Sequence, residues 1–252
     1  MNKTILITGA SSGIGHSLSL KFAQNGWQVI AAARRIRLLN SLSKQIKNNK
    51  AIKPIKIDIT DDKLLSSSIS KIIKKYGVPN IIFLNAGTNN PNSNHIVSME
   101  ELRKIFEINF FGTINCVSKF LPHIKNKKNI QIIIMSSVAG YRGLPYAAAY
   151  CSSKSAVTTY AEAIHAQCNQ LGIKIRVVNP GFIKTPLTDK NEFPMPMIMS
   201  SEKAADILFK KFIKSKSFEI NLPFMFCFIM KILKILPNKL YLNITKLMIK
   251  KL

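Results

Sequence analysis

The sequence predicts an α/β fold with a mainly parallel sheet and helices on both of its faces. Short apolar runs rich in β-branched residues recur along the chain, and segments with helical spacing separate them. The run Ile132, Ile133 and Ile134 is apolar without alternation, which is typical of a strand buried on both faces of a parallel sheet. The predicted strands lie at 3–8, 27–33, 55–59, 80–84, 132–134 and 174–179.

The length and composition indicate one such domain. The chain has 252 residues, of which 47% are hydrophobic and 19% charged, and this is enough to bury a single core. No internal repeat or low-complexity linker marks a second domain. We therefore place the main domain at residues 1–221 and treat 222–252 as an extension.

The first predicted strand runs directly into a glycine-rich turn, which helical spacing follows. Gly9 allows a tight turn, Gly13 allows the backbone to approach a phosphate, and Gly15 allows close helix packing. Free N–H groups at the start of the helix would face the anion. A glycine-rich turn alone is a weak signal, but its place between strand and helix favours dinucleotide binding.

A hydroxyl, a phenol and an ammonium group follow the strand at 132–134. Ser136 and Ser137 end this run, and Tyr150 and Lys154 are four residues apart, so they share one face of a helix. The Lys154 charge would lower the pKa of Tyr150 from about 10, and Ser137 could hold the same substrate oxygen. Taken alone, a Tyr-x-x-x-Lys pair is more often an amphipathic pair on a solvated helix face, so the surrounding motifs have to decide.

The second predicted strand ends at Ala33, and two arginines follow it. An acid at this junction would favour NAD(H), because it would accept hydrogen bonds from the ribose 2′-OH. Arg34 and Arg35 instead offer guanidinium groups that suit a 2′-phosphate. This predicts a preference for NADP(H) over NAD(H). The alternative is that both arginines only begin a solvated helix.

Five motifs in order resemble the short-chain dehydrogenase/reductase family over about residues 3–210. They are Thr8-Gly9-x-x-x-Gly13-Ile14-Gly15, Asn85-Ala86-Gly87, Ser137, Tyr150-x-x-x-Lys154 and Pro180-Gly181. The resemblance implies a single Rossmann-like, doubly wound domain with about seven strands, assembled as a homodimer or homotetramer. It also implies the interconversion of a carbonyl and an alcohol by hydride transfer.

The resemblance implies catalytic roles for Asn109, Ser137, Tyr150 and Lys154. Asn109 lies in a segment of helical spacing at 99–119 and would hold a relay water, although a satisfied core amide is the alternative. Asp58 would contact the adenine or act only as a turn residue. The expected cofactor-binding residues are Gly9, Ser11, Ser12, Gly13, Ile14, Gly15, Arg34, Arg35, Asp58, Ile59, Asn85, Ala86, Gly87, Tyr150, Lys154, Pro180, Gly181, Ile183 and Thr185.

The net charge of +25 raises nucleic acid or an anionic membrane as a partner. Most of this charge comes from lysines scattered among Ile and Asn, and no nucleic-acid motif accompanies them, so specific nucleic-acid binding is not expected.

The cysteines and the N-terminus favour a cytoplasmic protein. The four cysteines form no close pair, which predicts neither a metal site nor a disulfide framework and fits a reducing cytoplasm. Residues 1–10 contain only a short apolar run, so we expect no signal peptide.

Residues 186–200 form a predicted substrate lid rich in methionine. In the family this region covers the substrate, and an apolar lid favours a lipophilic one. Methionine also fills packing gaps beneath structured loops, so the composition alone fits both roles.

The extension at 222–252 contains no acidic residue. Its apolar run at 222–236 is shorter than the ~20 residues that span a bilayer, and two lysines interrupt it. We expect two short amphipathic helices that lie on an anionic membrane surface or pack on the lid or a neighbouring subunit.

Together these features predict an NADP(H)-dependent reductase of a lipophilic ketone or aldehyde. We expect it in the cytoplasm, with peripheral membrane contact through 222–252. The alternative is a non-catalytic dinucleotide-binding scaffold or sensor at a membrane surface.

Overall fold

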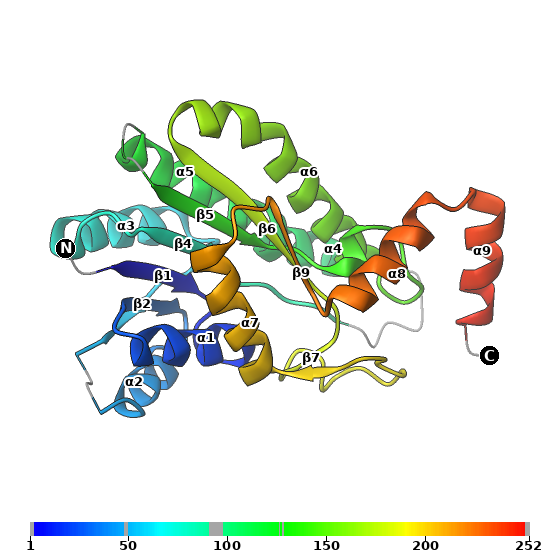
Figure 1. Ribbon diagram of the computed structural model, residues 1–252, viewed down its shortest axis with the longest axis horizontal. Helices are drawn as coiled ribbons and strands as arrows, with labels where there is room; N and C mark the ends of the chain where they lie inside the picture. Colours follow the sequence, from blue (N-terminus) through cyan, green and yellow to red (C-terminus); the bar gives the residue numbers. More distant parts are fainter. Residues whose placement is uncertain (1–2, 48–49, 91–97, 126, 128, 250–252) are drawn as a thin grey trace.

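Seven parallel strands form one twisted sheet in the order β3-β2-β1-β4-β5-β6-β9 (Figure 1). The computed structural model describes residues 3–47, 50–90, 98–125, 127 and 129–249. The order reverses direction between β1 and β4, so the sheet is doubly wound, and the predicted Rossmann-like α/β fold is confirmed. The strands are β1 (Thr4–Thr8), β2 (Gln28–Ala33), β3 (Ile52–Lys56), β4 (Ile81–Leu84), β5 (Ile130–Met135), β6 (Ile173–Pro180) and β9 (Glu219–Leu222).

Helices cover both faces of the sheet because neighbouring strand residues point to opposite sides (Figure 1). In β1, Ile5 and Ile7 pack on one side, while Leu6 packs on the other. The first side is covered by α1 (Gly13–Gln24), α2 (Ile36–Lys44) and α7 (Ser201–Lys214). The second side is covered by α3 (Asp62–Tyr76), α5 (Gly112–Ile124) and α6 (Ala148–Gln170).

The edge strand β3 lies three residues earlier than the sequence pattern predicts. It pairs with β2 from Ile52 to Lys56, and Ala33 is the last β2 residue in this register. Beyond this point β2 gives way to the turn into α2, so residues 57–59 leave the sheet although their hydrophobic pattern alternates like a strand. The strand was therefore predicted three residues too late, and residues 57–59 lie along the carboxyl edge of the sheet.

The predicted helix at 99–119 is interrupted by a wider turn. It begins as α4 (Met99–Phe106), passes through a π-helical turn (Glu107–Phe111) and continues as α5. A π turn contains one more residue than an α turn, and such insertions recur at functional sites. Asn109 lies in the middle of this turn and is fully buried.

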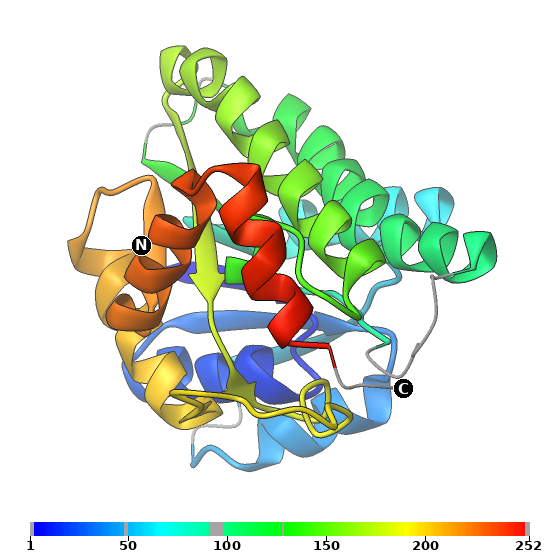
Figure 2. The same ribbon diagram turned by 90° about the vertical axis from the view of Figure 1, so that its right-hand side faces the viewer.

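The chain ends in two helices at the carboxyl end of the sheet. Two short strands, β7 (Ile183–Lys184) and β8 (Met199–Ser200), pair at the base of the predicted lid. After β9 come α8 (Phe224–Ile235) and α9 (Asn238–Leu247). Figure 2 looks at this end and shows α9 in front of the sheet, with α6 on one side and the lid loop below.

A single arginine holds the corner between α8 and α9. Arg142, in the segment that joins β5 to α6, donates hydrogen bonds to the carbonyls of Leu233 (2.8 Å) and Leu236 (2.7 Å), and to Asn238 Oδ1 (2.6 Å). Its guanidinium also lies 3.9 Å from the centre of the Tyr241 ring. The guanidinium thus satisfies carbonyls that the end of α8 leaves without helical partners. No helix within the described ranges is long and apolar enough to cross a membrane.

Candidate functional site

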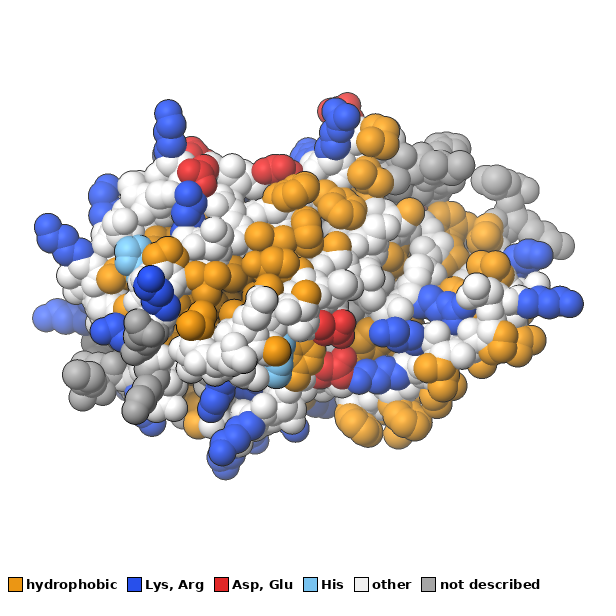
Figure 3. All heavy atoms as spheres, turned by 90° about the horizontal axis from the view of Figure 1, so that it is seen from above, with side chains coloured by type: hydrophobic (Ala, Val, Ile, Leu, Met, Phe, Trp, Pro, Cys, Tyr) orange, Lys and Arg blue, Asp and Glu red, His pale blue; other side chains and the backbone are white. Residues whose placement is uncertain are grey.

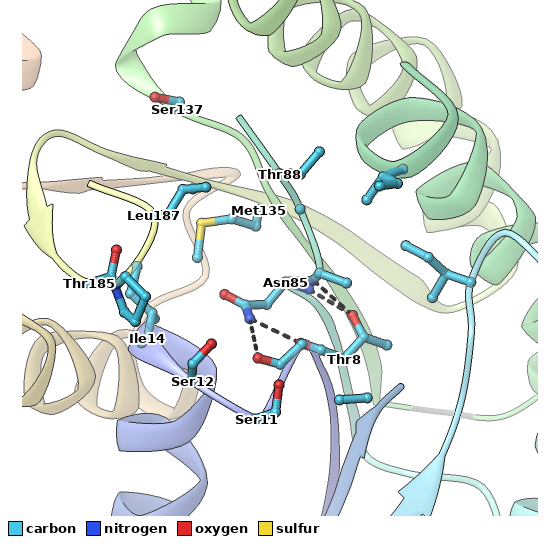
Figure 4. A pocket seen from close by; sticks show the side chains of 18 of the residues that line it. Thr8, Ser11, Ser12, Ile14, Asn85, Thr88, Met135, Ser137, Thr185 and Leu187 are labelled. Carbon is cyan, nitrogen blue, oxygen red and sulfur yellow. Dashed lines mark hydrogen bonds between the residues drawn. The ribbon is translucent and has the colours of Figure 1, made fainter. Parts of the chain in front are cut away.

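A cleft lies along the carboxyl edge of the sheet, where the ends of β1, β2, β4, β5 and β6 converge (Figure 4). Its cavity volume is about 280 Å³. Open α/β sheets bind ligands at this edge, next to the point where the strand order reverses. All of the sequence-predicted site residues line the cleft except Gly15 and Asn109.

The glycine-rich turn approaches the end of β4 closely. Gly9 has φ +68°, and a Cβ built on it would lie 2.9 Å from both Ala86 Cα and Asn85 Nδ2. The Thr8 hydroxyl accepts hydrogen bonds from the N–H groups of Asn85 (3.0 Å) and Ala86 (3.1 Å). The Asn85 amide in turn donates to the Thr8 carbonyl at 3.0 Å, as Figure 4 shows. Side-chain bracing therefore joins the two strand ends that form the floor of the cleft.

Gly15 lies behind the cleft and acts through packing. A Cβ at this position would lie 2.5 Å from the Gly9 carbonyl oxygen and 2.7 Å from Asn85 Nδ2. Gly15 therefore lets α1 begin directly against the turn, which is the packing role that the sequence predicts.

The start of α1 offers backbone N–H groups to the cleft. Ser12 is the N-cap residue, yet its side chain makes no capping hydrogen bond, and the first turn contains no acidic residue. Gly13 has φ +55° and also lines the cleft. Uncapped N–H groups and the positive end of the helix dipole favour an anion, so the residues present fit a dinucleotide phosphate.

Two arginines lie at the far end of the cleft, after β2. Arg35 donates hydrogen bonds to the hydroxyls of Ser11 (2.8 Å) and Ser12 (3.0 Å). Arg34 is exposed, with Nη1 4.0 Å from Asp58 Oδ2. The other Asp58 oxygen accepts hydrogen bonds from the N–H and hydroxyl of Thr60. The arginines, hydroxyls and carboxylate of this end therefore come from three separate turns.

Ser137, Tyr150 and Lys154 meet at the opposite end of the cleft. Ser137 follows β5 and caps a short 3₁₀ turn (Val138–Gly140) by accepting the Ala139 N–H at 3.1 Å. Lys154 is 3% exposed and donates to the Met135 carbonyl at 2.9 Å. Its Nζ lies 5.8 Å from the centre of the Tyr150 ring. Ser136, the other predicted hydroxyl, contacts the Lys154 carbonyl (3.1 Å) and so braces β5 on α6.

Burial controls the protonation of this cluster. It raises the pKa of Tyr150 to about 12, and a hydrogen bond with Ser137 lowers it only in part. Burial also lowers the pKa of Lys154 to about 8. The expected lowering of the Tyr150 pKa by the Lys154 charge is therefore not found: loss of water raises this pKa, and the Lys154 ammonium is turned toward the Met135 carbonyl.

Asn109 supports the cleft from behind. Its Oδ1 accepts the Thr88 N–H at 2.7 Å, and its Nδ2 donates to the Thr88 carbonyl (2.9 Å) and Ser153 Oγ (3.0 Å). The Asn109 carbonyl accepts the Thr113 hydroxyl at 2.8 Å. The amide is thus satisfied within the protein, which agrees with the core-amide alternative. A Cβ on Gly87 would lie 3.2 Å from Asn109 Oδ1 and 3.5 Å from Lys154 Nζ.

The turn after β6 closes the cleft above these residues. Thr185 packs on the glycine turn, since a Cβ on Gly13 would lie 2.9 Å from Thr185 Cγ2. The Thr188 hydroxyl donates to the Ile183 carbonyl at 2.6 Å and accepts the Thr185 N–H at 3.0 Å. This bonding holds the beginning of the lid over the cleft, where Leu187 also points inward (Figure 4).

Several lining residues were not among the expected catalytic or cofactor-binding residues, although some lie in segments that the sequence singled out. Thr88 and Ile108 adjoin predicted residues, and Met135 and Thr8 end strands, so chain position was the available signal. Ala32, Ala33 and Ser136 lie at the ends of predicted strands, Ile57 and Thr60 lie beyond the end of β3, which was predicted three residues too late, and the remaining three belong to the predicted lid. The full set is Thr8, Ala32, Ala33, Ile57, Thr60, Thr88, Ile108, Met135, Ser136, Pro186, Leu187 and Thr188. Within the described part of the chain, no His, Cys, Asp or Glu group could hold a metal ion.

Comparisons with known proteins give a consistent result. The sequence profile of the short chain dehydrogenase family matches residues 3–194. An uncharacterized oxidoreductase of Myxococcus xanthus is 30% identical over 240 residues, covering 95% of this chain and 94% of that protein. An NADPH-dependent pterin aldehyde reductase of Arabidopsis thaliana is 33% identical over 186 residues, covering 73% and 76%.

Solved structures share the fold. A short-chain dehydrogenase from Streptomyces avermitilis has a TM-score of 0.83 at 22% identity and covers 98% of this chain and 96% of that one. A family member from Burkholderia phymatum in complex with NAD has a TM-score of 0.81 at 19% identity, covering 91% and 92%. At these identities the likeness concerns the backbone fold.

Proposed function

Because the chain belongs to the short-chain dehydrogenase/reductase family and is an oxidoreductase of that type, we propose that it is an NADP(H)-dependent reductase of a lipophilic ketone or aldehyde. The observation that carries the proposal is the pair of arginines after β2, at the end of the cleft opposite Tyr150.

The NADP(H) preference rests on charge at the ribose end. Arg34 and Arg35 line the cleft, and the hydroxyls of Ser11 and Ser12 fix Arg35 in place. A 2′-phosphate would accept charge-assisted hydrogen bonds from these groups, whereas the last residue of β2, Ala33, offers no carboxylate to a free ribose hydroxyl. The similarity to an NADPH-dependent reductase supports this preference.

The catalytic cluster would then act on a carbonyl at the nicotinamide end. When bound, the cofactor supplies a hydride to the carbonyl carbon. Ser137 donates a hydrogen bond to the carbonyl oxygen, and Tyr150 gives its phenolic proton to that oxygen as negative charge develops. Lys154 would hold the nicotinamide ribose and support the return of a proton to Tyr150. Asn109 positions Thr88 and, in the proposed relay, a water between Lys154 and solvent.

The protonation state favours reduction over oxidation. With a pKa of about 12, Tyr150 keeps its proton at neutral pH. A protonated phenol is the form that a carbonyl reduction consumes, whereas alcohol oxidation needs the phenolate. We therefore expect the rate of carbonyl reduction to exceed the rate of alcohol oxidation near neutral pH.

The lipophilic substrate class rests on the lid. Leu187 and Pro186 line the cleft, while Phe193 and Met197 are exposed at 37% and 50%. Apolar side chains on both surfaces of this loop favour a substrate with an apolar body beyond its carbonyl group.

The test is NADPH and NADH oxidation with a panel of ketones and aldehydes graded in chain length. We expect Tyr150→Phe to lower kcat by about 10²–10⁴-fold while NADPH still binds. Arg34→Ala should lower the preference for NADPH over NADH by about 10–100-fold, as loss of a charged hydrogen bond implies. Arg37→Ala, on the exposed side of α2, is the matched control.

The alternative is a non-catalytic dinucleotide-binding scaffold or sensor at a membrane surface. It would be supported if NADPH bound and neither carbonyl reduction nor alcohol oxidation with NADP⁺ occurred. We place the protein in the cytoplasm as a homodimer or homotetramer, with the extension at 222–252 in peripheral contact with a membrane.

A further inference from the structure

Exposed apolar side chains gather on the two C-terminal helices. Of the twenty large hydrophobic residues that are exposed among the described residues, twelve lie between Phe224 and Ile249. Monomeric proteins rarely expose continuous apolar surfaces of this kind without a partner. The residues are Phe224, Met225, Phe228, Ile229, Ile232, Ile235, Leu240, Leu242, Ile244, Leu247, Met248 and Ile249.

In α8 these side chains form one stripe. At 100° per residue the six exposed hydrophobic positions of α8 fall within about 140° of the helix circumference. The opposite side packs on the domain, where Cys227 and Met230 contact Val138 and Tyr141. The stripe is therefore a second apolar face of α8. It stays exposed although the face with Cys227 and Met230 is buried against the domain.

The charged residues beside the stripe are basic, apart from Glu219, which pairs with Lys231. The segment after Glu219 contains six lysines and no acid. The four that the structure describes are Lys231, Lys234, Lys239 and Lys246, and Figure 3 shows orange and blue side chains side by side at the end where α8 and α9 lie. A second copy seated on this surface would bring lysines against lysines, in a chain of net charge +25. An anionic lipid surface supplies both acyl chains and the opposite charge.

We infer that the surface formed by α8 and α9 docks on an anionic lipid bilayer and holds the substrate end of the cleft against it. Gly181 and Phe182 follow β6 at the cleft, and a Cβ on Gly181 would lie 2.5 Å from the Phe226 ring of α8. The ring of Phe182 contacts both Phe226 (5.6 Å between centres) and Phe193 of the lid (6.0 Å). The helices, the turn over the cleft and the lid thus form one apolar contact chain that leads from the proposed bilayer contact to the edge of the cleft, and we expect a substrate dissolved in lipid to enter along it. This delivery rests on the proposed function.

The experiment compares matched glutamate variants of the full chain on vesicles. Met225 and Phe228 in α8 have exposed fractions of 55% and 51%, and Met99 and Phe111 elsewhere have 63% and 54%. Met225→Glu/Phe228→Glu should weaken sedimentation with phosphatidylcholine vesicles that contain phosphatidylglycerol by at least about tenfold. Met99→Glu/Phe111→Glu should leave it unchanged. Lys239→Gln/Lys246→Gln should weaken it about 25-fold at low salt, at about fivefold for each lysine.

Three outcomes would overturn the inference. They are equal binding to vesicles with and without the anionic lipid, equal loss in both glutamate pairs, and self-association of the wild type that Met225→Glu/Phe228→Glu abolishes. Reduction of a water-soluble ketone separates this test from the proposed function. If the reductase proposal is right, all four proteins reduce it equally, and only the apparent KM for a vesicle-dissolved ketone rises, by at least about tenfold, in Met225→Glu/Phe228→Glu. If no carbonyl is reduced while the vesicle results stand, the reductase proposal fails and the docking surface remains.

Discussion

Lys154 is a titratable residue whose side chain is almost completely buried. Its pKa in the folded protein, about 8, lies below its ordinary value of 10.5 because burial disfavours the ammonium. Between these pH values the unfolded chain holds a proton that the folded chain has lost, so the free energy of unfolding rises with pH across this window. Below pH 8 the Lys154 ammonium stays charged in the folded protein, and its burial lowers the free energy of unfolding by roughly 3 kcal/mol.

Lys154→Met should therefore stabilise the protein at neutral pH while it removes the catalytic ammonium. We expect a gain of about 2 kcal/mol in the free energy of unfolding, since loss of the hydrogen bond to the Met135 carbonyl offsets part of the benefit. Urea unfolding across the pH range measures the effect. The gain should vanish as pH approaches 10.5, and a constant difference at all pH values would contradict the argument.

Gly181 lies in close contact with α8 at the edge of the cleft. A Cβ there would meet the Phe226 ring at 2.5 Å and Pro223 Cδ at 3.4 Å, so one of the partners must move. We expect Gly181→Ala to lower the free energy of unfolding by about 1–3 kcal/mol, as overpacking does. A smaller side chain opposite, in Gly181→Ala/Phe226→Leu, should restore part of the loss in the same urea experiment. No restoration would mean that the strain lies elsewhere.

Residue types in sequence order were enough to predict most of the cleft but not its internal bonding. The glycine turn, Tyr150 and Lys154 were accessible because their spacing is local. Arg35 and Ser11 are hydrogen-bonded although 24 residues separate them, and no local pattern signals that contact. The protonation of Tyr150 was mispredicted because the charge of Lys154 is visible in the sequence, whereas the depth of burial is not.

At the scale of elements, the corner between α8 and α9 depends on a distant side chain. Arg142 binds carbonyls 91 to 94 residues further along the chain and stacks on Tyr241. Arg142→Met should free these carbonyls and loosen both helices. We expect proteolysis within 222–252 to become at least about tenfold faster, since hydrogen bonds to charged groups contribute about 1.5–3 kcal/mol each. Arg103→Met, at an exposed position of α4, should leave the rate unchanged.

The sequence predicted elements well where buried periodicity is long, and it failed at a one-residue insertion in a helix and at the bounds of an edge strand. Central strands such as β5 are apolar on both faces, and this continuous apolar run predicts them directly. The π turn around Asn109 adds a single residue to a helical pattern, which the spacing of apolar residues does not resolve. In the described part of the chain, the edge strand β3 pairs only with β2. Its last residue is therefore set by where β2 ends, and the alternation of apolar residues in β3 itself continues past that point.

At the scale of the whole molecule, the net charge of +25 opposes compaction. Within the described residues there are four ion pairs between side chains, and Figure 3 shows basic groups spread over the visible face. Added salt should therefore raise the melting temperature, because the Debye length falls to about 8 Å at physiological ionic strength and screens the repulsion. Calorimetry in sodium chloride measures this. A fall in melting temperature would show that attractive pairs dominate.

Because Cys227 is buried, its reactivity can report how often α8 separates from the domain. The thiol is 1% exposed beneath the helix, donates to the Asn179 carbonyl at 3.3 Å, and has its pKa raised to about 11 by burial. The thiolate is the form that attacks alkylating reagents, so the thiol is nearly inert while α8 is packed on the domain. Each reaction at Cys227 then records one lifting of α8 from the domain. The rate of Cys227 alkylation therefore measures how often α8 separates from the domain.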